Sequence, residues 1–405
     1  MHDRIRRAIC RFFFLFLVLL PTLVVAGWSI YANSGPGVES RREGWEQRLE
    51  QLLGTQVTIE SVRPVFPGTV EFKQLQLSLP GDEQPMVTIG QLQLTRGQLQ
   101  RLQLEKVHVD ADQFGYWVDW LEQTTRQLSD DLQLRLVIKQ LVFDHGSDQD
   151  SFAEVVGVLD GSDDGSQAII NLWQESSQGD PLALQLIHQP EEKGRYRWIL
   201  QTGSSPLPTR LLASQLSPLS RLGTQSLFDG QLTCVRGGQP GRVELVGQFQ
   251  EVDLESLSGF PASGMLAGSG QLEVRRCRVL DGACQFLDVV LRSDGGSVDT
   301  GWLQATAQRW DAMLPQGAGA RQAFTDLSCH LELDGNGIRI RGREEGPGRG
   351  ALLRQADRVL LAQPRVEWLS VAQLVEVLVP ASQERLPATR HTARLLRAIE
   401  LPQLR

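Results

Sequence analysis

Cysteine and histidine side chains are the groups in this sequence best suited to nucleophilic catalysis or to metal binding. The five cysteines are Cys10, Cys234, Cys277, Cys284 and Cys329. No two of them have the Cys-x-x-Cys spacing of a zinc knuckle or a thioredoxin-type redox site. Cys277 and Cys284 are close enough in sequence for a disulfide across a hairpin. The alternative is that the four cysteines after Cys10 are free thiols that behave as small apolar residues.

The histidines and acidic loops do not form a recognisable metal site. No two of the six histidines share a metal-ligand spacing, and His330, next to Cys329, would face the opposite side of a strand. The run Asp160-x-Ser162-x-Asp164-Gly165 is the closest approach to a calcium loop. An EF-type loop ends in a bidentate Glu at position twelve, which is Asn171 here, so we interpret the run as a solvated hairpin turn.

Known catalytic motifs are missing from the chain. It contains no P-loop, no GxGxxG after a strand, no HExxH and no GxSxG nucleophile elbow. A glycosidase on a β scaffold would need two converging carboxylates, and the sequence nominates no such pair. We therefore predict no catalytic residue, no metal site and no cofactor, and a protein that is not an enzyme.

One apolar pattern recurs in the first third of the chain and predicts the elements that surround any site. Side chains alternate between the two faces of a strand, so the doubled polar residue inside the pattern would turn half of the apolar set outward. A β-bulge or kink would keep the set on one face and give a curved sheet with an apolar concave face. The other interpretation is two short strands that meet at a corner. The four copies are Val70-x-Phe72-x-x-Leu75-x-Leu77, Val87-x-Ile89-x-x-Leu92-x-Leu94, Leu102-x-Leu104-x-x-Val107-x-Val109 and Leu136-x-Ile138-x-x-Leu141-x-Phe143.

Apolar spacing and turn residues predict further helices and turns along the chain. Apolar residues at helical spacing predict helices over residues 39–53, 114–128, 300–314, 369–379 and 391–399. Asp334-Gly335-Asn336-Gly337, between two alternating apolar runs, predicts a β-hairpin. Further turns are expected at residues 144–146, 160–165, 281–282 and 294–296.

The N-terminus predicts a membrane segment. Four arginines up to Arg11 precede residues 12–31, which carry no charge and as a helix would span about 30 Å, the thickness of a bilayer core. The positive-inside rule places the N-terminus in the cytoplasm and the rest of the chain outside, which in a bacterium means an inner-membrane protein with a periplasmic body. The alternative is a cleavable signal peptide with a site at Val24-Val25-Ala26. No second apolar run of this length follows, so a single span is expected.

Composition limits the possible partners. The chain of 405 residues is 41% hydrophobic, which is enough to bury a large core. Its formal net charge of −8 argues against a sequence-independent nucleic-acid binder, because such a protein needs a basic excess.

These features together resemble the N-terminal region of the AsmA-like family, which includes TamB and related inner-membrane proteins. In that family an anchor leads into a helix that ends in Leu-Gly and then into alternating strands. The counterparts here are Leu53-Gly54, Val57-x-Ile59, Pro67-Gly68 and Val70-x-Phe72. The likeness covers roughly residues 1–145, and its motifs are structural, so no catalytic residue can be carried over.

The resemblance implies an anchored protein whose curved β-sheet forms a hydrophobic groove, with a role in phospholipid transfer or outer-membrane and envelope assembly. We expect a mainly β fold with a few helices, in which a transmembrane helix precedes a curved, taco-like antiparallel sheet. The expected divisions are an anchor (1–33), an AsmA-like region (34–205) and a C-terminal β-rich region (206–405). The alternative function is a non-catalytic scaffold that binds envelope proteins through a closed β-body, since alternation fits both.

Overall fold

The computed structural model describes residues 35–370 with gaps, and two compact units are evident within the chain. The first unit holds residues up to Asp110 together with Leu134–Gln149, and the second holds Ala111–Gln133 and the chain from Asp150 onward. The boundary expected near residue 205 therefore falls inside the second unit. The gaps are 54, 67, 79–84, 96–98, 111–117, 119–121, 123–124, 126–132, 146–147, 163–164, 175–178, 190–194, 214–215, 237–240, 258–265, 311–319 and 344–348.

The first unit is a sheet with one long helix. Its elements are α3 (Gly35–Leu53), β1 (Gln56–Phe66), β2 (Thr69–Ser78), β3 (Val87–Thr95), β4 (Leu99–Asp110) and β5 (Gln133–His145). Strands β1 to β4 pair in chain order and antiparallel. The helix predicted over residues 39–53 is confirmed and begins four residues earlier.

Strand β5 differs in orientation from the antiparallel strands β1 to β4. It follows β4 in the sheet order. Two side-chain pairs, Glu105–Lys139 at 2.8 Å and His108–Asp144 at 3.2 Å, advance together along both strands, so β5 runs parallel to β4. A parallel neighbour requires a crossover connection, which residues 111–132 supply. The sheet is therefore mixed, whereas the sequence predicted an antiparallel one.

In β2, β3 and β4 the repeated apolar pattern belongs to a single strand, and the two residues between its apolar pairs lie side by side across the sheet. The pairings place Leu75 opposite Ile89 and Leu92 opposite Leu104, with no change of register across the doubled residues. Gln74 in β2 has φ of 48°, the local kink that lets Phe72 and Leu75 both face inward. A kink that runs across neighbouring strands bends the whole sheet, so the kink interpretation is confirmed over the corner.

Helix α3 covers the apolar face and also one edge of the first unit. Trp45 packs edge-on against the buried Phe72, with ring centroids 5.2 Å apart. The carboxylates of Glu46 and Glu50 accept hydrogen bonds from the backbone N–H groups of Ile59 (2.8 Å) and Val57 (3.2 Å) in β1. These bonds occupy donors that an edge strand would otherwise present to another chain.

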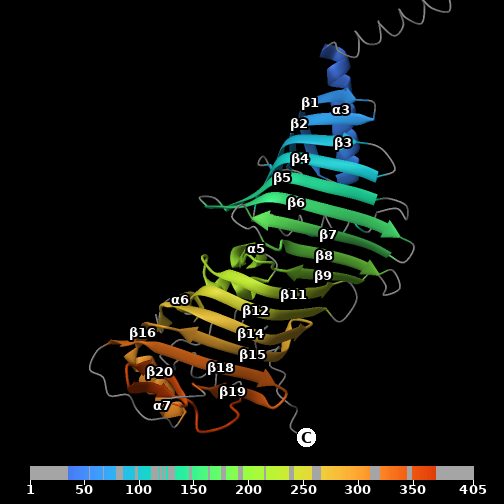
Figure 1. Cartoon of the computed structure of the whole chain (residues 1–405). Helices are drawn as coiled ribbons and strands as arrows, with labels where there is room; N and C mark the ends of the chain where they lie inside the picture. The colour runs from blue at the N-terminus through green and yellow to red at the C-terminus, as the bar shows by residue number, and fades with distance from the viewer. Residues whose placement is uncertain are drawn as a thin grey trace, which may run out of the picture. The chain divides into compact units, whose positions relative to one another are not determined.

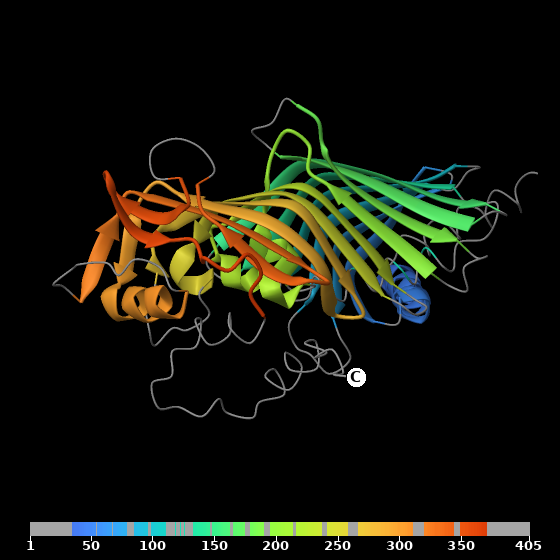
Figure 2. The same cartoon turned by 90° about the horizontal axis from the view of Figure 1, so that it is seen from below.

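The second unit is a long antiparallel ladder. Its strands pair in the order β6–β7–β8–β9–β11–β12–β14–β15–β18, and β18 then pairs with both β19 and β20. Figure 1 shows these strands stacked in chain order. Figure 2 shows that they curve, with short helices on the inner side of the curve. The ladder strands are β6 (Asp148–Ser162), β7 (Gly165–Gln174), β8 (Leu182–Gln189), β9 (Arg195–Gln201), β11 (Leu227–Arg236), β12 (Arg242–Asp253), β14 (Ser269–Leu280), β15 (Ala283–Ser293), β18 (Asp326–Asp334), β19 (Gly337–Arg341), β20 (Ala351–Gln355) and β21 (Arg358–Ala362).

At one end of this ladder, short helices and strands pack around a hydrophobic core. Helix α7 packs with a three-stranded sheet and with β18 to β21 around Leu303, Phe324 and Leu353, all 2% exposed or less. These elements and the other short ones are β10 (Leu207–Pro208), α5 (Thr209–Ala213), η4 (Ser217–Leu222), α6 (Leu254–Leu257), β13 (Leu266–Ala267), β16 (Gly296–Asp299), α7 (Thr300–Arg309) and β17 (Arg321–Phe324).

The turn predictions are largely confirmed, and the helix predictions in part. The hairpin at 334–337 forms with Asp334 paired to Gly337, and the run 160–165 joins β6 to β7 as a hairpin. The helix expected over 300–314 is present as α7 and ends at Arg309. Val118, Glu122 and Thr125 are helical, in agreement with the helix expected over 114–128. Leu369 was expected to begin a helix. It instead forms an isolated β-bridge with Ile338, in which the backbone N–H of each residue donates to the carbonyl oxygen of the other. The segments 12–31, 371–379 and 391–399 lie outside the described residues.

Candidate binding surfaces of the second unit

Strand pairing gathers apolar residues from distant parts of the sequence onto one face of the second unit. Pairs such as Leu232–Leu245 and Leu287–Leu333 stand directly opposite each other, and each strand contributes alternate residues to the same face. We call the part of this face on β11 to β18 the apolar lane. It consists of Leu232, Cys234, Leu245, Val243, Cys277, Val279, Cys284, Leu287 and Leu333.

The apolar lane is less covered than the same face on β6 to β9. On β8 and β9, Leu186, Trp198 and Leu200 are all buried. The indole Nε1 of Trp198 donates to the carboxylate of Glu122, which belongs to the helical residues between β4 and β5 in sequence. In the lane, Val243, Val279 and Leu287 are only half-buried. The sheet thus carries one apolar face that is closed at β9 and partly open from β11 onward.

All four cysteines after Cys10 lie on the apolar face, as free thiols. Cys277 and Cys284 are on neighbouring strands of the β14–β15 hairpin, close enough for a hydrogen bond between their thiols. This bond lowers the pKa of Cys284 to about 7 and raises the pKa of Cys277. Burial raises the pKa of Cys329 to about 12 and also raises that of Cys234. Of the two interpretations of the cysteines, the structure has the free thiols.

The opposite face of the same strands carries arginine–carboxylate groups. In each group one carboxylate lies between two guanidinium groups: Glu244 between Arg242 and Arg278, and Glu273 between Arg275 and Arg292. Glu332 and Asp326 are shared in the same way. The hydrogen bond from Arg341 holds the pKa of Glu332 below its ordinary value, and that from Arg242 does the same for Glu244.

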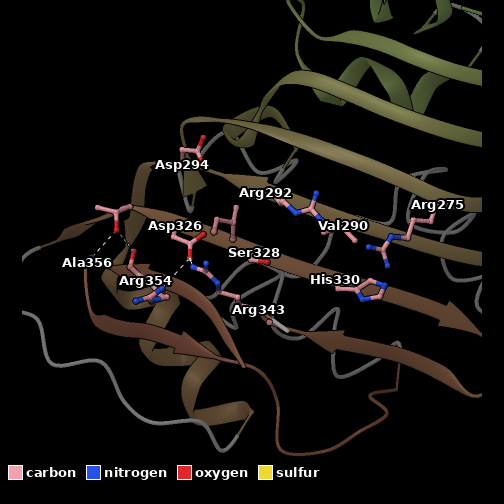
Figure 3. A pocket seen from close by; sticks show the side chains of 13 residues that line it. Arg275, Val290, Arg292, Asp294, Asp326, Ser328, His330, Arg343, Arg354 and Ala356 are labelled. Carbon is pink, nitrogen blue, oxygen red and sulfur yellow. Dashed lines mark hydrogen bonds and ion pairs between the residues drawn. The ribbon is translucent and has the colours of Figure 1, made fainter. Parts of the chain in front are cut away.

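A polar pocket of about 590 Å³ opens on this arginine-bearing face. Figure 3 shows Arg275 and Arg292 on neighbouring strands, with Arg343 and Arg354 close to Asp326. No sequence motif predicted this pocket. The i, i+2 spacing of Arg339 and Arg341 predicts basic side chains on one face of a strand, but only Arg343, which follows β19, lines the pocket.

The residues considered earlier for metal chemistry are separated in the fold. Cys329 packs against the apolar core, while His330 on the other side of β18 pairs with Asp288 at 2.8 Å. Within the described ranges, no group of three or more His, Cys, Asp or Glu side chains is arranged to hold a metal ion. His108 is half-buried, with its Nδ1 3.2 Å from Oδ2 of Asp144.

Comparisons with protein-family models, with curated proteins and with solved structures found no match to this chain. Among the helices that the structure describes, none combines the length and apolar character needed to cross a bilayer. The AsmA-like resemblance therefore rests on the sequence motifs alone. The fold itself is mainly β, with a curved, open sheet.

Proposed function

We propose that the protein is anchored in the bacterial inner membrane by residues 12–31 and shelters phospholipid acyl chains on its periplasmic apolar lane. The observation that carries this proposal is the half-buried state of Val243, Val279 and Leu287 on an otherwise covered apolar face. A face that is apolar and only partly covered is typical of a binding surface. The absence of any recognised catalytic motif in the sequence agrees with a transfer role, which needs no reactive side chain.

The size of the apolar lane suits an acyl chain. Five strands, β11, β12, β14, β15 and β18, contribute to it, and strands lie ~4.8 Å apart, so it measures roughly 19 Å across the ladder. Half of a bilayer core, the length occupied by one acyl chain, is about 15 Å. Each methylene group removed from water contributes about 0.8 kcal/mol, so even partial burial of one chain gives measurable affinity.

The test is lipid mass spectrometry on the full chain purified from membranes in mild detergent. Val243→Asp places a charge in the apolar lane, and Val246→Asp places one on the same strand but on the opposite face, where Val246 is 50% exposed. We expect near-stoichiometric phospholipid with the wild type and Val246→Asp, and loss of lipid with Val243→Asp. Circular dichroism melts check that both variants fold. A lipid-free wild type, or equal lipid in the two variants, would contradict the proposal.

The first unit favours the alternative, a scaffold with a closed body. Ile89 and Leu92, which the sequence placed in an open groove, are 7% and 9% exposed. The first unit therefore offers protein partners a polar exterior and leaves little of its described apolar face for lipid. A wild-type protein that is well folded and lipid-free, yet co-purifies in a fixed ratio with one envelope protein, would support the scaffold over lipid transfer.

A further inference from the structure

We infer that the pocket between β14, β15, β18 and β20 binds a phosphate group. Four arginines line it, three on the strands β14, β15 and β20 and one just after β19, and the hydroxyl of Ser328 adds a short polar donor. Guanidinium groups present planar sets of N–H donors that match phosphate oxygens, and several of them around one hollow suit a tetrahedral anion. The arginines are Arg275, Arg292, Arg343 and Arg354.

The residues that line the pocket carry a positive excess. Glu273 lies 3.2 Å from Arg275 and 3.1 Å from Arg292, so one negative charge serves two positive ones. Asp326 is shared in the same way, at 3.1 Å from Arg343 and 3.8 Å from Arg354. The lining itself holds four guanidinium groups and two carboxylates, Asp294 and Asp326, while Glu273 and the fully exposed Asp357, 3.9 Å from Arg354, lie outside it. This excess occurs in a chain whose net charge is −8, so it is a local property of the pocket.

Two arginines of the lining, Arg354 and Arg292, are suited to contact a bound anion. The side chain of Arg354 is 11% exposed, and its Nε is a buried donor without an acceptor among the described residues. A buried donor without an acceptor costs free energy that a bound anion offsets. Arg292, 55% exposed, can leave Glu273 and turn toward a ligand at little cost, because an exposed ion pair contributes little.

The phosphate site and the apolar lane lie on opposite faces of the sheet, because Arg292 and Ser328 alternate along their strands with Leu291 and Cys329 of the apolar face. The two proposals are therefore independent of each other. Two sources share the chemistry: the headgroup of a phospholipid, and a soluble phosphate or phosphate ester. A nucleic acid is disfavoured by the net charge of the chain.

The test is calorimetric titration of the full chain in detergent with two probes, inorganic phosphate and dihexanoyl phosphatidic acid. The variant Arg275→Gln/Arg292→Gln removes two exposed arginines of the lining. The matched control Arg242→Gln/Arg278→Gln removes the same Arg–Glu–Arg arrangement around Glu244, which does not line the pocket. We expect about a tenfold or greater loss of affinity in the first variant and a change within about twofold in the control.

The two probes distinguish the sources. Binding of inorganic phosphate with similar affinity to the lipid supports a soluble phosphate, and binding of phosphatidic acid alone supports a headgroup. No binding of either probe by the wild type overturns the inference, and so does an equal loss in both double variants, which would reflect net charge alone. Val243→Asp should leave phosphate binding unchanged, so failure of the acyl-chain proposal would not be mistaken for failure of this one.

Discussion

Gly230 on β11 and Gly247 on β12 stand directly opposite each other, with φ of 154° and 151°. A Cβ built on Gly230 would lie 2.3 Å from the carbonyl oxygen of Val246, and one on Gly247 would lie 2.3 Å from that of Asp229. Beside them Phe228 and Phe249 are in ring contact, with centroids 4.9 Å apart. The two strands therefore approach each other in a way that only glycine allows, at the start of the apolar lane.

Replacing either glycine should destabilise the second unit. We expect Gly247→Ala or Gly230→Ala to lower the free energy of unfolding by about 1–3 kcal/mol, because the backbone must shift to accept the methyl group. Urea unfolding followed by circular dichroism measures the change. Gly335→Ala is the control, since a Cβ there meets nothing within 4 Å, and it should change stability by no more than about 0.5 kcal/mol. If Gly335→Ala lowers the free energy of unfolding as much as Gly247→Ala or Gly230→Ala, the close approach of the two strands is not the cause.

The ion pair between Arg210 and Asp150 should contribute to stability far more than the exposed pairs. Arg210 Nη2 lies 2.7 Å from Asp150 Oδ1 and Nε 2.9 Å from Oδ2, with side chains 20% and 13% exposed. Arg210→Met leaves the carboxylate largely buried without this partner, which should cost about 2–4 kcal/mol. Lys139→Met breaks a 2.8 Å pair whose members are 55% and 48% exposed, and should cost less than about 1 kcal/mol. The measurement is the free energy of unfolding of each variant. A smaller loss for Arg210→Met than for Lys139→Met would refute this ranking.

Cys284 should be the most reactive thiol of the folded second unit. Its pKa of about 7 means that roughly half of it is thiolate at neutral pH, whereas burial keeps Cys329 protonated. The rate of alkylation by iodoacetamide should rise with pH through about 7. In Cys277→Ala the thiol hydrogen bond is lost, so the pKa of Cys284 should move up toward the ordinary value of ~8.5 and the alkylation rate at neutral pH should fall severalfold.

Peptide mass spectrometry of the alkylated protein gives the rate at each cysteine. Cys234→Ala is the control, because Cys234 is not among the causes of the Cys284 shift. An unchanged midpoint in Cys277→Ala would mean that the thiol pair does not set the reactivity of Cys284.

Much of the local structure could be predicted from the sequence. The alternation around Asp334–Gly337 gave the hairpin, because turn residues and period-two apolar runs act within a few residues of each other. The two-residue gap in the repeated pattern was compatible with a bulge or kink or with a corner between two strands, and the structure has the kink, which keeps Phe72 and Leu75 on one face. The helix at 39–53 followed from its apolar spacing for the same local reason.

The candidate sites depended on pairing, which no local pattern contains. Nothing in the sequence around Glu273 shows that Arg292 will lie beside it, and nothing near Asp326 points to Arg343 and Arg354. Likewise, Ile89 and Val243 look alike as apolar strand residues, yet one is buried and the other half-buried. The difference arises from which elements cover each strand, and that is set by contacts between residues far apart in the chain.

By itself, the sequence determined that strands would form, where many of them would turn, and that one face of them would be apolar. Those properties follow from side-chain alternation and turn chemistry, which operate over short stretches of chain. The tertiary structure alone decided that β5 would run parallel to β4, that four cysteines would share one face, and that four arginines would surround one pocket. Such arrangements are set by hydrogen bonding and packing between distant strands, whose partners local patterns leave open.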